Sequence, residues 1–525
     1  MNKYYAHFED NGSVIVVNLQ DLNITVTYDN KEEFMQQMMK KTCEIFIHEL
    51  GYNGAFISYY LNDLGYTHVP VYGNLNKLEP KQYQKLVSDI GGIYNIRIRR
   101  TKSVQIKITD SSKLIALDII KLKKVVPKET PDCLVIPMLL KELHDNGHTK
   151  MTMGANAFKS FIDITFKGNY FKFRDLFPQL PLNIDEYIRK SYKGGWCYIN
   201  PEYQGKRLSG VKGLTLDVNS LFPSVMYNSR LPWGEPVYFK GEYKEDTKYP
   251  LYISKVILKD VMLKDGKVPC LSNPEDVGYL EEIDYIEVTL TSVELDLIKE
   301  CYYADIEFID GYKFKSCKGM FKDYIDFYMN KKINASNSVE RFIAKMFLNS
   351  LYGKFGTQVV RHKMDFIINS KGMEQRIATK ETYTTKMYYT AMASFISAYA
   401  KCVTVRGANN NFNRFIYADT DSLHLIGTKE DVIGLEIDNS KLGAWKIERN
   451  FRDSKFLGVK TYMELEEGKE EWEVRCAGLP YVAQLAIKDP SEFEYEKEIN
   501  VQVRQKVAGG ATVVNRTFVI SKNVV

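Results

Sequence analysis

Two aspartates one residue apart stand in the sharpest turn signal of the chain. Residues 415–425 read FIYADTDSLHL, in which two apolar halves flank Asp419 and Asp421. This pattern predicts a hairpin that presents carboxylates at its tip. Neighbouring carboxylates repel each other unless a cation or hydrogen bonds neutralise them, and Mg²⁺ prefers oxygen ligands of this kind. Taken alone, the segment also fits an ordinary Asx-turn.

A third carboxylate, Asp217, ends a predicted strand. Residues 214–218 read LTLDV, and the chain then turns into an apolar helix start. Asp217 can therefore meet Asp421 and bind two metal ions about 3.5 to 4 Å apart. By itself, a strand-ending aspartate is more often the N-cap of the following helix.

A helical pattern over 319–352 carries a third group of polar side chains. Lys345, Asn349 and Tyr352 follow each other at i, i+4 and i+7, so they share one face. A cation, an amide and an aromatic ring on one face can hold a triphosphate and stack against a nucleobase. The alternative is a solvated stripe with a core tyrosine.

Composition excludes several classes of protein. The chain has 525 residues, which predicts several folding units, and its 71 basic and 66 acidic side chains leave a net charge of +5. This balance does not identify a nucleic-acid partner. The eight cysteines lie far apart without a C-x-x-C pair, which argues against a disulfide framework or a zinc ribbon. No signal peptide and no run of 18 apolar residues is present. We expect a cytoplasmic protein without a membrane partner.

The elements expected around these residues are mixed. Residues 4–30 alternate like strands, and a helix is predicted over 32–41. Short strands and turns are expected over 228–315, and a helix of small and apolar residues over 390–405.

Taken together, the three groups resemble motifs A, B and C of family B DNA polymerases. D-V-N-S-L-F-P, K-x-x-x-N-S-L-Y-G and Y-A-D-T-D-S occur in that order and approximate spacing. Two further segments resemble motifs of the protein-primed, terminal-protein-dependent bacteriophage branch. Residues 192–195 look like its Y-x-G-G linker motif, and 460–462 like its K-x-Y motif. The resemblance is strong from about residue 150 to 480.

The resemblance implies an α+β multidomain, right-hand polymerase with palm, fingers and thumb. It also implies two terminal-protein-region insertions and an N-terminal RNase H-like, exonuclease-type α/β domain. The implied domains are 1–187 (exonuclease-like), 188–228 (linker and first part of the palm), 229–318 (terminal protein region 1), 319–356 (fingers), 357–388 (terminal protein region 2), 389–480 (rest of the palm) and 481–525 (thumb).

The implied reaction is template-directed nucleotidyl transfer from a dNTP to a primer 3′-hydroxyl. Asp217 and Asp421 would be catalytic with support from Asp419. Asp217, Asp421 and the Val218 carbonyl would hold two Mg²⁺ ions, for which Mn²⁺ can substitute.

The resemblance also implies substrate contacts. Val218, Phe222, Lys345, Asn349 and Tyr352 would bind the nucleotide, aided by Lys331 or Lys332. Phe222 stands at the sugar-selecting position, where tyrosine is usual. The residues expected to contact DNA are Tyr192, Gly194, Gly195, Lys460 and Tyr462. The implied partners are primer-template DNA, dNTPs and a terminal protein that primes synthesis. The implied synthesis is processive and displaces a strand. It would take place in the host cytoplasm if a phage encodes the chain.

The N-terminal segment departs from the family's exonuclease motifs. His7 and Glu9 stand at the D-x-E motif, Asn53 replaces a ligand aspartate, and Asp132 can be aligned with the third motif although Lys128 replaces its tyrosine. Neutral His and Asn cannot supply the charge that Mg²⁺ needs. We expect proofreading to be absent or very weak, with the domain kept as a scaffold on which His48 and Tyr52 bind DNA.

Two other functions are compatible with these motifs. One is a polymerase specialised for RNA templates or untemplated addition, since paired aspartates in a hairpin also occur in reverse transcriptases. The other is a nucleic-acid-binding remnant, which the intact Asp217, Asp419, Asp421 and Lys345 argue against.

Overall fold

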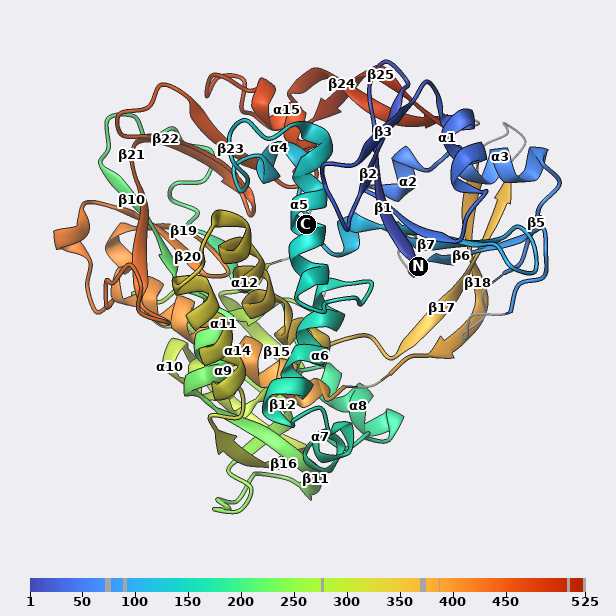
Figure 1. The fold of residues 1–525 in the computed structure, drawn as a ribbon. Coiled ribbons are helices and arrows are strands. Elements are labelled where there is room, and N and C mark those ends of the chain that lie inside the picture. Colours follow the sequence, from blue (N-terminus) through green and yellow to red (C-terminus); the bar gives the residue numbers. More distant parts are fainter. Residues whose placement is uncertain are drawn as a thin grey trace.

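The computed structural model describes residues 1–70, 77–87, 92–274, 278–368, 374–386, 388–507 and 510–522. Figure 1 shows the N-terminal sheet on one side of the molecule and a second, central sheet on the other, with helices between them. Within these ranges no helix is both long and apolar enough to span a bilayer.

The N-terminal sheet has eight strands in the order β3-β2-β1-β4-β8-β7-β6-β5. Its strands are β1 (Asn2–Phe8), β2 (Val14–Asn18), β3 (Thr25–Tyr28), β4 (Cys43–Ile47), β5 (Thr67–His68), β6 (Gln82–Val87), β7 (Ile93–Arg99) and β8 (Gln105–Asp110). The helices that lie between these strands in the sequence are α1 (Lys31–Met38), α2 (Leu50–Asn53) and α3 (Ile57–Asp63), and α4 (Ile119–Leu122) follows the last strand. The α/β start expected from the alternation over 4–30 is confirmed. Because β1, β4 and β8 are mutually parallel, their carboxyl ends meet at one edge.

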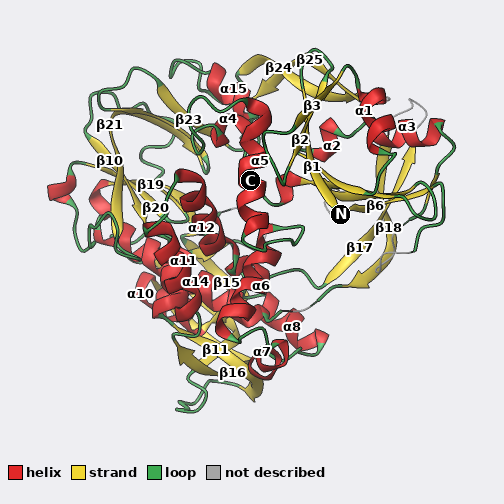
Figure 2. Ribbon diagram, in the orientation of Figure 1, coloured by secondary structure: helices red, strands yellow, loops and turns green. Residues whose placement is uncertain are grey.

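Four helices connect this sheet to the rest of the chain: α5 (Asp132–Asp145), α6 (Met153–Thr165), α7 (Tyr170–Leu176) and α8 (Leu182–Arg189). Helices α5 and α6 pack against α12 (Ser338–Ser350), and α6 also packs against α11 (Lys322–Ile333). The Phe161 and Phe321 rings stack with centroids 4.8 Å apart at this junction. Figure 2 shows the central helices gathered between the sheets.

The central sheet has seven strands in the order β23-β22-β21-β10-β20-β19-β9. They are β9 (Cys197–Ile199), β10 (Gly213–Val218), β19 (Phe415–Asp419), β20 (Ser422–Ile426), β21 (Trp445–Gly458), β22 (Thr461–Glu466) and β23 (Trp472–Cys476). Helix α14 (Thr390–Asn410) packs against β19 and β20, and α9 (Leu221–Asn228) follows β10. Small residues allow α14 to approach closely: a Cβ on Gly407 would lie 2.9 Å from Leu423 Cδ1.

The expectation of short strands over 228–315 is wrong. This segment forms a four-stranded sheet, β11-β16-β12-β15, whose strands are 10 to 17 residues long. They are β11 (Arg230–Lys240), β12 (Leu251–Leu263), β15 (Glu282–Thr291) and β16 (Tyr302–Lys318), with α10 (Ser292–Cys301) and the short pair β13 (Leu271–Ser272) and β14 (Tyr279–Leu280). Charged side chains on the solvent face interrupt the apolar runs, so that the sequence pattern of each long strand predicts several short ones.

The predicted helix over 319–352 is divided into α11 and α12, because the Asn337 side chain accepts a hydrogen bond from the Glu340 N–H and starts a new helix. A short helix, α13 (Tyr352–Phe355), follows, and then the hairpin β17 (Val360–Ile368) and β18 (Glu374–Thr384). Residues 369–373 and 387 of the predicted second insertion lie outside the described residues. The C-terminal segment contains α15 (Tyr481–Ala486) and the hairpin β24 (Glu498–Val507) and β25 (Gly510–Val519), which packs on α2.

Candidate active site

Strand pairing brings Asp217 and Asp421 together. Strand β10 pairs with β20 so that Asp217 lies opposite Ser422, and the Val218 N–H donates a 2.8 Å hydrogen bond to the Asp421 carbonyl. The turn between β19 and β20 is tight, with Thr420 in the left-handed region at φ 60°. The predicted hairpin with carboxylates at its tip is therefore confirmed.

The three aspartates sit in different electrostatic surroundings. Burial, followed by repulsion from Asp217 and Asp419, raises the pKa of Asp421 to about 6. Burial alone would also raise the pKa of Asp419. Hydrogen bonds from the Cys197 thiol at 3.0 Å and the Lys460 ammonium at 2.9 Å outweigh burial, so that this pKa is lowered. Asp419 is thus already compensated, whereas at Asp421 burial and repulsion outweigh the attraction of Lys446.

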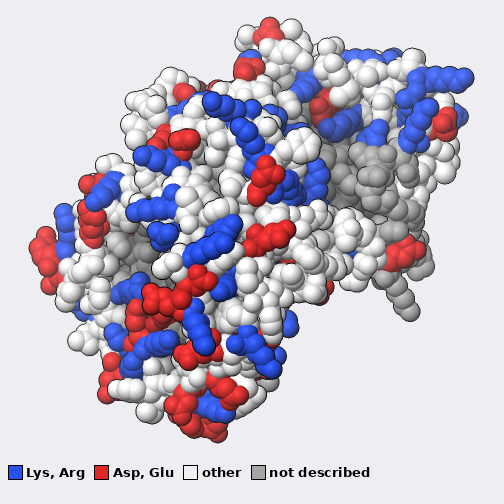
Figure 3. Space-filling model, turned by 90° about the horizontal axis from the view of Figure 1, so that it is seen from below, with Lys and Arg blue, Asp and Glu red and all other residues white. Residues whose placement is uncertain are grey.

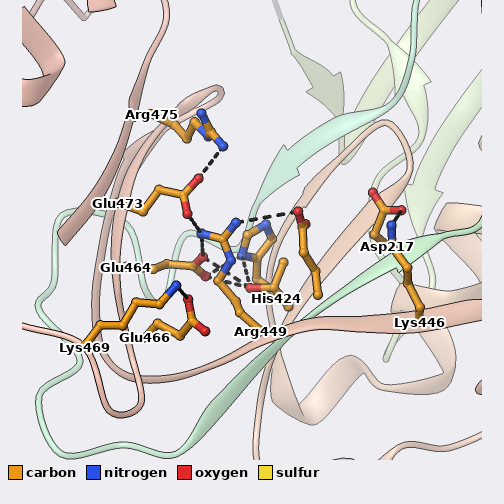
Figure 4. Close-up of polar contacts among 11 residues, drawn as sticks. Asp217, His424, Lys446, Arg449, Glu464, Glu466, Lys469, Glu473 and Arg475 are labelled. Atoms are coloured by element: carbon orange, nitrogen blue, oxygen red, sulfur yellow. Dashed lines mark hydrogen bonds and ion pairs between the residues drawn. The ribbon is translucent and has the colours of Figure 1, made fainter. Parts of the chain in front are cut away.

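The donor set at this edge fits a hard divalent cation. Two carboxylates meet there, and burial together with repulsion from Asp217 and Asp419 disfavours the charged form of Asp421, a cost that a bound cation would relieve. In the described part of the chain, no group of three or more His, Cys, Asp or Glu side chains converges as a complete metal site would. One oxygen of Asp217 is instead paired with the Lys446 ammonium at 3.0 Å (Figure 4).

Two of the predicted nucleotide-binding rings stack on each other. The Phe222 and Tyr352 rings lie 4.0 Å apart and are nearly parallel, at 8°. Phe222 reaches this place because Ser220 adopts a left-handed conformation at φ 55°, which turns the chain sharply from β10 into α9. The pKa of Tyr352 is raised to about 12 by burial and by nearby Tyr192 and Asp421. The stack therefore borders the carboxylates.

The predicted polar face of the helix pair is exposed beside this stack. Lys345 and Asn349 are both exposed one turn apart on α12. Burial lowers the pKa of Lys332, and the charges of Lys345, Arg341 and Lys446 lower it further. Lys331 instead donates to Asn146 Oδ1 at 3.0 Å, so Lys332 is the better placed of the two predicted lysines.

The predicted linker motif packs against the aspartate turn. A Cβ on Gly195 would lie 2.4 Å from Thr420 Oγ1, and the Trp196 carbonyl accepts from the Thr420 N–H at 2.8 Å. Gly195 is therefore required for this close approach, whereas a Cβ on Gly194 would meet nothing within 4 Å. The ring of Tyr192 lies over Gly356, where a Cβ would come within 2.4 Å of it.

The other predicted DNA contacts lie on β22 and just before it. The Lys460 ammonium forms an ion pair with Asp419. The backbone N–H of Lys460 donates a hydrogen bond to the Tyr417 hydroxyl at 2.8 Å. The Tyr462 ring stacks on Phe456 with centroids 5.4 Å apart and lies 5.0 Å from the His424 ring.

A buried charged network that the sequence analysis missed lies directly behind the aspartates. Glu464 is fully buried and binds His424 Nδ1 at 2.7 Å, the Thr215 hydroxyl at 3.0 Å and Arg449 at 3.5 Å (Figure 4). Burial opposes ionisation of Glu464, but His424 and Arg449 outweigh it and lower its pKa. Thr215 and His424 are cross-strand partners on β10 and β20. The available signal was a charged residue between apolar neighbours in a strand, such as Glu464 between Met463 and Leu465 in TYMELE.

The predicted remnants of the exonuclease motifs converge in a second cleft. It has a volume of about 750 Å³ and is bordered by the carboxyl ends of β1 and β4, by α2, and by the C-terminal hairpin. Its lining includes all six residues that the sequence analysis placed there: His7, Glu9, His48, Tyr52, Asn53 and Asp132.

Several charged groups of this cleft are already paired within the protein. Arg504 of β24 donates to Asn53 Oδ1 at 2.9 Å and to Asp10 at 3.3 Å. His7 lies 3.5 Å from Glu9, and burial lowers its pKa despite the nearby carboxylates. Asp132 forms an ion pair with Lys123. The position expected to hold a metal-binding aspartate therefore carries a neutral amide bound to a guanidinium.

His48 and Tyr52 differ in what they can offer a ligand. His48 is buried, and its ring nitrogens face Ser111 Oγ and the Leu117 carbonyl, each at 3.1 Å. Tyr52 is 44% exposed, and Lys506 lies 5.2 Å from its ring centroid. Tyr52 is therefore the better placed of the two for stacking against a base.

On the face of the molecule that Figure 3 shows, basic and acidic side chains are interspersed, and neither kind forms one continuous patch. This agrees with the near balance of charges in the sequence. On this face, electrostatic attraction for a polyanion would depend on local groups rather than on a continuous basic surface.

Comparisons with known proteins agree with this geometry. Residues 82–434 match the family described as DNA polymerase type B, organellar and viral. The DNA polymerase of Bacillus phage Nf is 33% identical over 86% of this chain and 83% of the relative. That of Bacillus phage phi29 is 31% identical over 96% of this chain and 95% of the relative.

Solved structures are similar over nearly the whole chain. The phi29 DNA polymerase in a ternary complex with primer-template DNA and incoming nucleotide matches with a TM-score of 0.87 and 28% identity, over 99% of this chain and all of that one. The same polymerase complexed with single-stranded DNA matches with a TM-score of 0.87.

Proposed function

Because the chain belongs to the type B DNA polymerases of organelles and viruses, we propose that Asp217 and Asp421 form the site at which it joins a dNTP to a primer 3′-hydroxyl. The prediction of a DNA-directed DNA polymerase of the protein-primed phage branch, with a right-hand polymerase fold, is confirmed. Neither an RNA-template or untemplated enzyme nor an inactive remnant is favoured.

The observation that carries the proposal is the pairing of β10 with β20, which sets two carboxylates side by side at the sheet edge. Polymerases of this family use divalent metal ions. We assign two Mg²⁺ ions, or Mn²⁺ in their place, to Asp217, Asp421 and the Val218 carbonyl; bound there, they would activate the 3′-hydroxyl and stabilise charge on the phosphates. Asp419 supports the turn through Lys460 rather than supplying a free carboxylate.

The assignment is tested by primer extension with Asp421→Asn and Asp419→Asn. We expect Asp421→Asn to lower extension by about 10³-fold or more, because a metal ligand is lost, while primer-template affinity stays within about twofold. Asp419→Asn should lose less, because its partner Lys460 already neutralises it. An Asp421→Asn variant that extends primers at the normal rate would overturn the assignment.

Phe222 and Tyr352 form the floor of the proposed nucleotide site, with Lys345, Lys332 and Asn349 above it. We propose that the Phe222 ring, which stacks on Tyr352, excludes a ribose 2′-oxygen by bulk alone, so that dNTP selectivity does not need the hydroxyl of a tyrosine. Phe222→Ala should raise the efficiency of rNTP incorporation about tenfold or more relative to dNTPs, and Phe222→Tyr should not. Equal use of rNTPs and dNTPs by the unaltered protein would contradict this role.

We assign DNA contacts to Tyr192, Gly194 and Gly195 on the template and to Lys460 and Tyr462 at the primer end. Primer-template DNA and nucleotides are bound in the phi29 ternary complex, which supports this assignment. The domain ranges given above remain our assignment for palm, fingers and thumb. If a phage encodes the chain, we place its action in the host cytoplasm.

The two insertions, 229–318 and 357–388, are our candidates for binding a terminal protein and enclosing DNA. The described part of the second is the hairpin β17 and β18. Deleting 360–385 should leave extension of a short primer intact but abolish long products and strand displacement. Displacement synthesis at the normal length without this segment would count against the role.

We further propose that the N-terminal cleft has lost proofreading and holds single-stranded DNA without cleaving it. The Arg504 guanidinium occupies the position where a metal ligand is expected, by donating to the neutral Asn53, and Tyr52 is exposed for stacking. The phi29 polymerase with single-stranded DNA is a structural neighbour, which supports this role. Single-stranded DNA should bind about tenfold more weakly to Tyr52→Ala, since one stacked base is worth about 1–3 kcal/mol. Unchanged affinity would remove Tyr52 from the role.

A further inference from the structure

Lys446 is a cation at the proposed catalytic edge to which no sequence motif assigns a role. Its ammonium lies 3.0 Å from Asp217 Oδ1, and the two residues are cross-strand partners on β21 and β10 (Figure 4). The side chains of Lys446 and Asp217 are 33% and 23% exposed, so the pair opens toward solvent rather than being sealed in the core.

An irregularity in β21 aims this lysine at the catalytic edge. Asp217 pairs with Lys446 and Thr215 with Arg449, so three steps on β21 match two on β10 and Glu448 is the extra residue. In a regular strand, residues three apart point to opposite faces. The bulge instead places Lys446 and Arg449 on the face that Asp217 and Thr215 share.

The two cations on this face have different partners. Arg449 contacts the buried Glu464 and also Glu473, so its charge is committed to the network behind the site. Lys446 lies at the solvent-accessible end of that row, beside Asp217. Its four-carbon stem can swing a compact charge from one oxygen to another.

Lys446 also shares electrostatic coupling with basic residues of α11 and α12. After burial, Lys345, Arg341 and Lys446 are the charges that depress the pKa of Lys332, and Asp217 opposes them. These groups therefore share one electrostatic environment, although they belong to α11, α12, β10 and β21. A triphosphate in this space would have cations on both sides.

We propose that Lys446 binds the triphosphate of the incoming nucleotide from the sheet side and, in the free enzyme, neutralises Asp217. An ammonium and a divalent ion compete for the same carboxylate oxygens, so Lys446 leaves Asp217 when a metal ion binds there and turns to a phosphate oxygen. This inference rests on the proposed role of Asp217 as a metal ligand.

Removing Lys446 should change two affinities in opposite directions. In the protein alone, Lys446→Ala should bind Mn²⁺ about threefold more tightly, measured by electron paramagnetic resonance, because a competing charge is gone. In a complex with a dideoxy-terminated primer in Ca²⁺, the same variant should bind dNTP about tenfold more weakly, the scale of one charge-assisted hydrogen bond. Damage to the fold would weaken both affinities.

Two variants control this measurement. Lys446→Arg keeps the charge and should keep dNTP affinity within about threefold. Lys441→Ala removes an exposed lysine from the segment just before β21, where it pairs with Glu436, and should change neither affinity. Unchanged dNTP affinity in Lys446→Ala, or a loss of both affinities, overturns the inference.

Asp217→Asn separates this inference from the assignment on which it rests. If Asp217→Asn extends primers normally, the proposed role of Asp217 fails. If Asp217→Asn is inactive while Lys446→Ala binds Mn²⁺ and dNTP like the unaltered protein, only the role of Lys446 fails.

Discussion

The proposed polymerase site and the N-terminal cleft both lie at the edge of a sheet where polar side chains gather. The two sites differ in how those side chains are paired. In the cleft, the parallel strands β1 and β4 end at one edge, whereas at the polymerase site β10 ends where the antiparallel strand β20 begins. At the first edge, Asp217 is paired with a lysine that can swing away. At the second, Asn53 is bound by Arg504 from a strand 451 residues further along the chain.

The difference illustrates how the metal site that we propose was lost from the cleft could disappear without loss of the fold. The strands that end at the N-terminal cleft also build a core, in which Ile45, Ile47 and Ile108 are fully buried. Replacing ligands at the strand ends leaves that core intact. Contact with the C-terminal hairpin then gives the same residues a structural use.

The largest effect should come from matched substitutions in the two regions. Asp217→Asn should lower primer extension by about 10³-fold or more, because it removes a proposed metal ligand. Asp132→Asn, the same change in the cleft, should leave extension within about twofold, since Asp132 pairs only with a surface lysine. Extension rates on one primer-template measure both. If Asp132→Asn abolished a nuclease activity, both regions would depend on a carboxylate for catalysis, and the contrast between them would fail.

A smaller effect is expected where the linker packs against the aspartate turn. Gly195→Ala puts a Cβ 2.4 Å from Thr420 Oγ1 and should displace the turn, lowering extension about 10- to 100-fold. Gly194→Ala is the matched control, because its Cβ would meet nothing within 4 Å. Equal activity of the two variants would show that the turn tolerates this displacement.

The smallest effects are expected at Arg504. Its partners Asn53 and Asp10 lie near the surface, so Arg504→Ala should lower the free energy of unfolding by less than about 1 kcal/mol, measured by denaturant titration. Asn53→Asp should strengthen the contact with Arg504 and leave single-stranded DNA undigested, because the guanidinium neutralises the new carboxylate. Digestion by Asn53→Asp alone would show that Arg504 does not block the cleft.

The sequence predicted the proposed site well where chemistry restricts residue type. Asp217, Asp421 and the Phe222 and Tyr352 pair lie together as expected. It also predicted β10, the β19 to β20 hairpin and α14. It failed for the long strands of 228–315, whose solvent-facing charges hide their length.

The missed contacts depend on tertiary structure. The approach of Lys446 to Asp217 depends on one extra residue in β21, which no spacing rule reveals. His424 and Glu464 are 40 residues apart, and Arg504 and Asn53 are 451 apart. Such pairs are set by strand register and domain packing, which a single sequence does not encode in local patterns.

The most direct test uses one preparation and one 5′-labelled DNA in Mg²⁺. With a template and dNTPs, the account predicts extension of the labelled primer. As a single strand without nucleotides, the same DNA should remain intact on a denaturing gel. Shortening from the 3′ end, retained in Asp217→Asn, would contradict the account, because the cleft of His7 and Asn53 would then still bind catalytic metal ions.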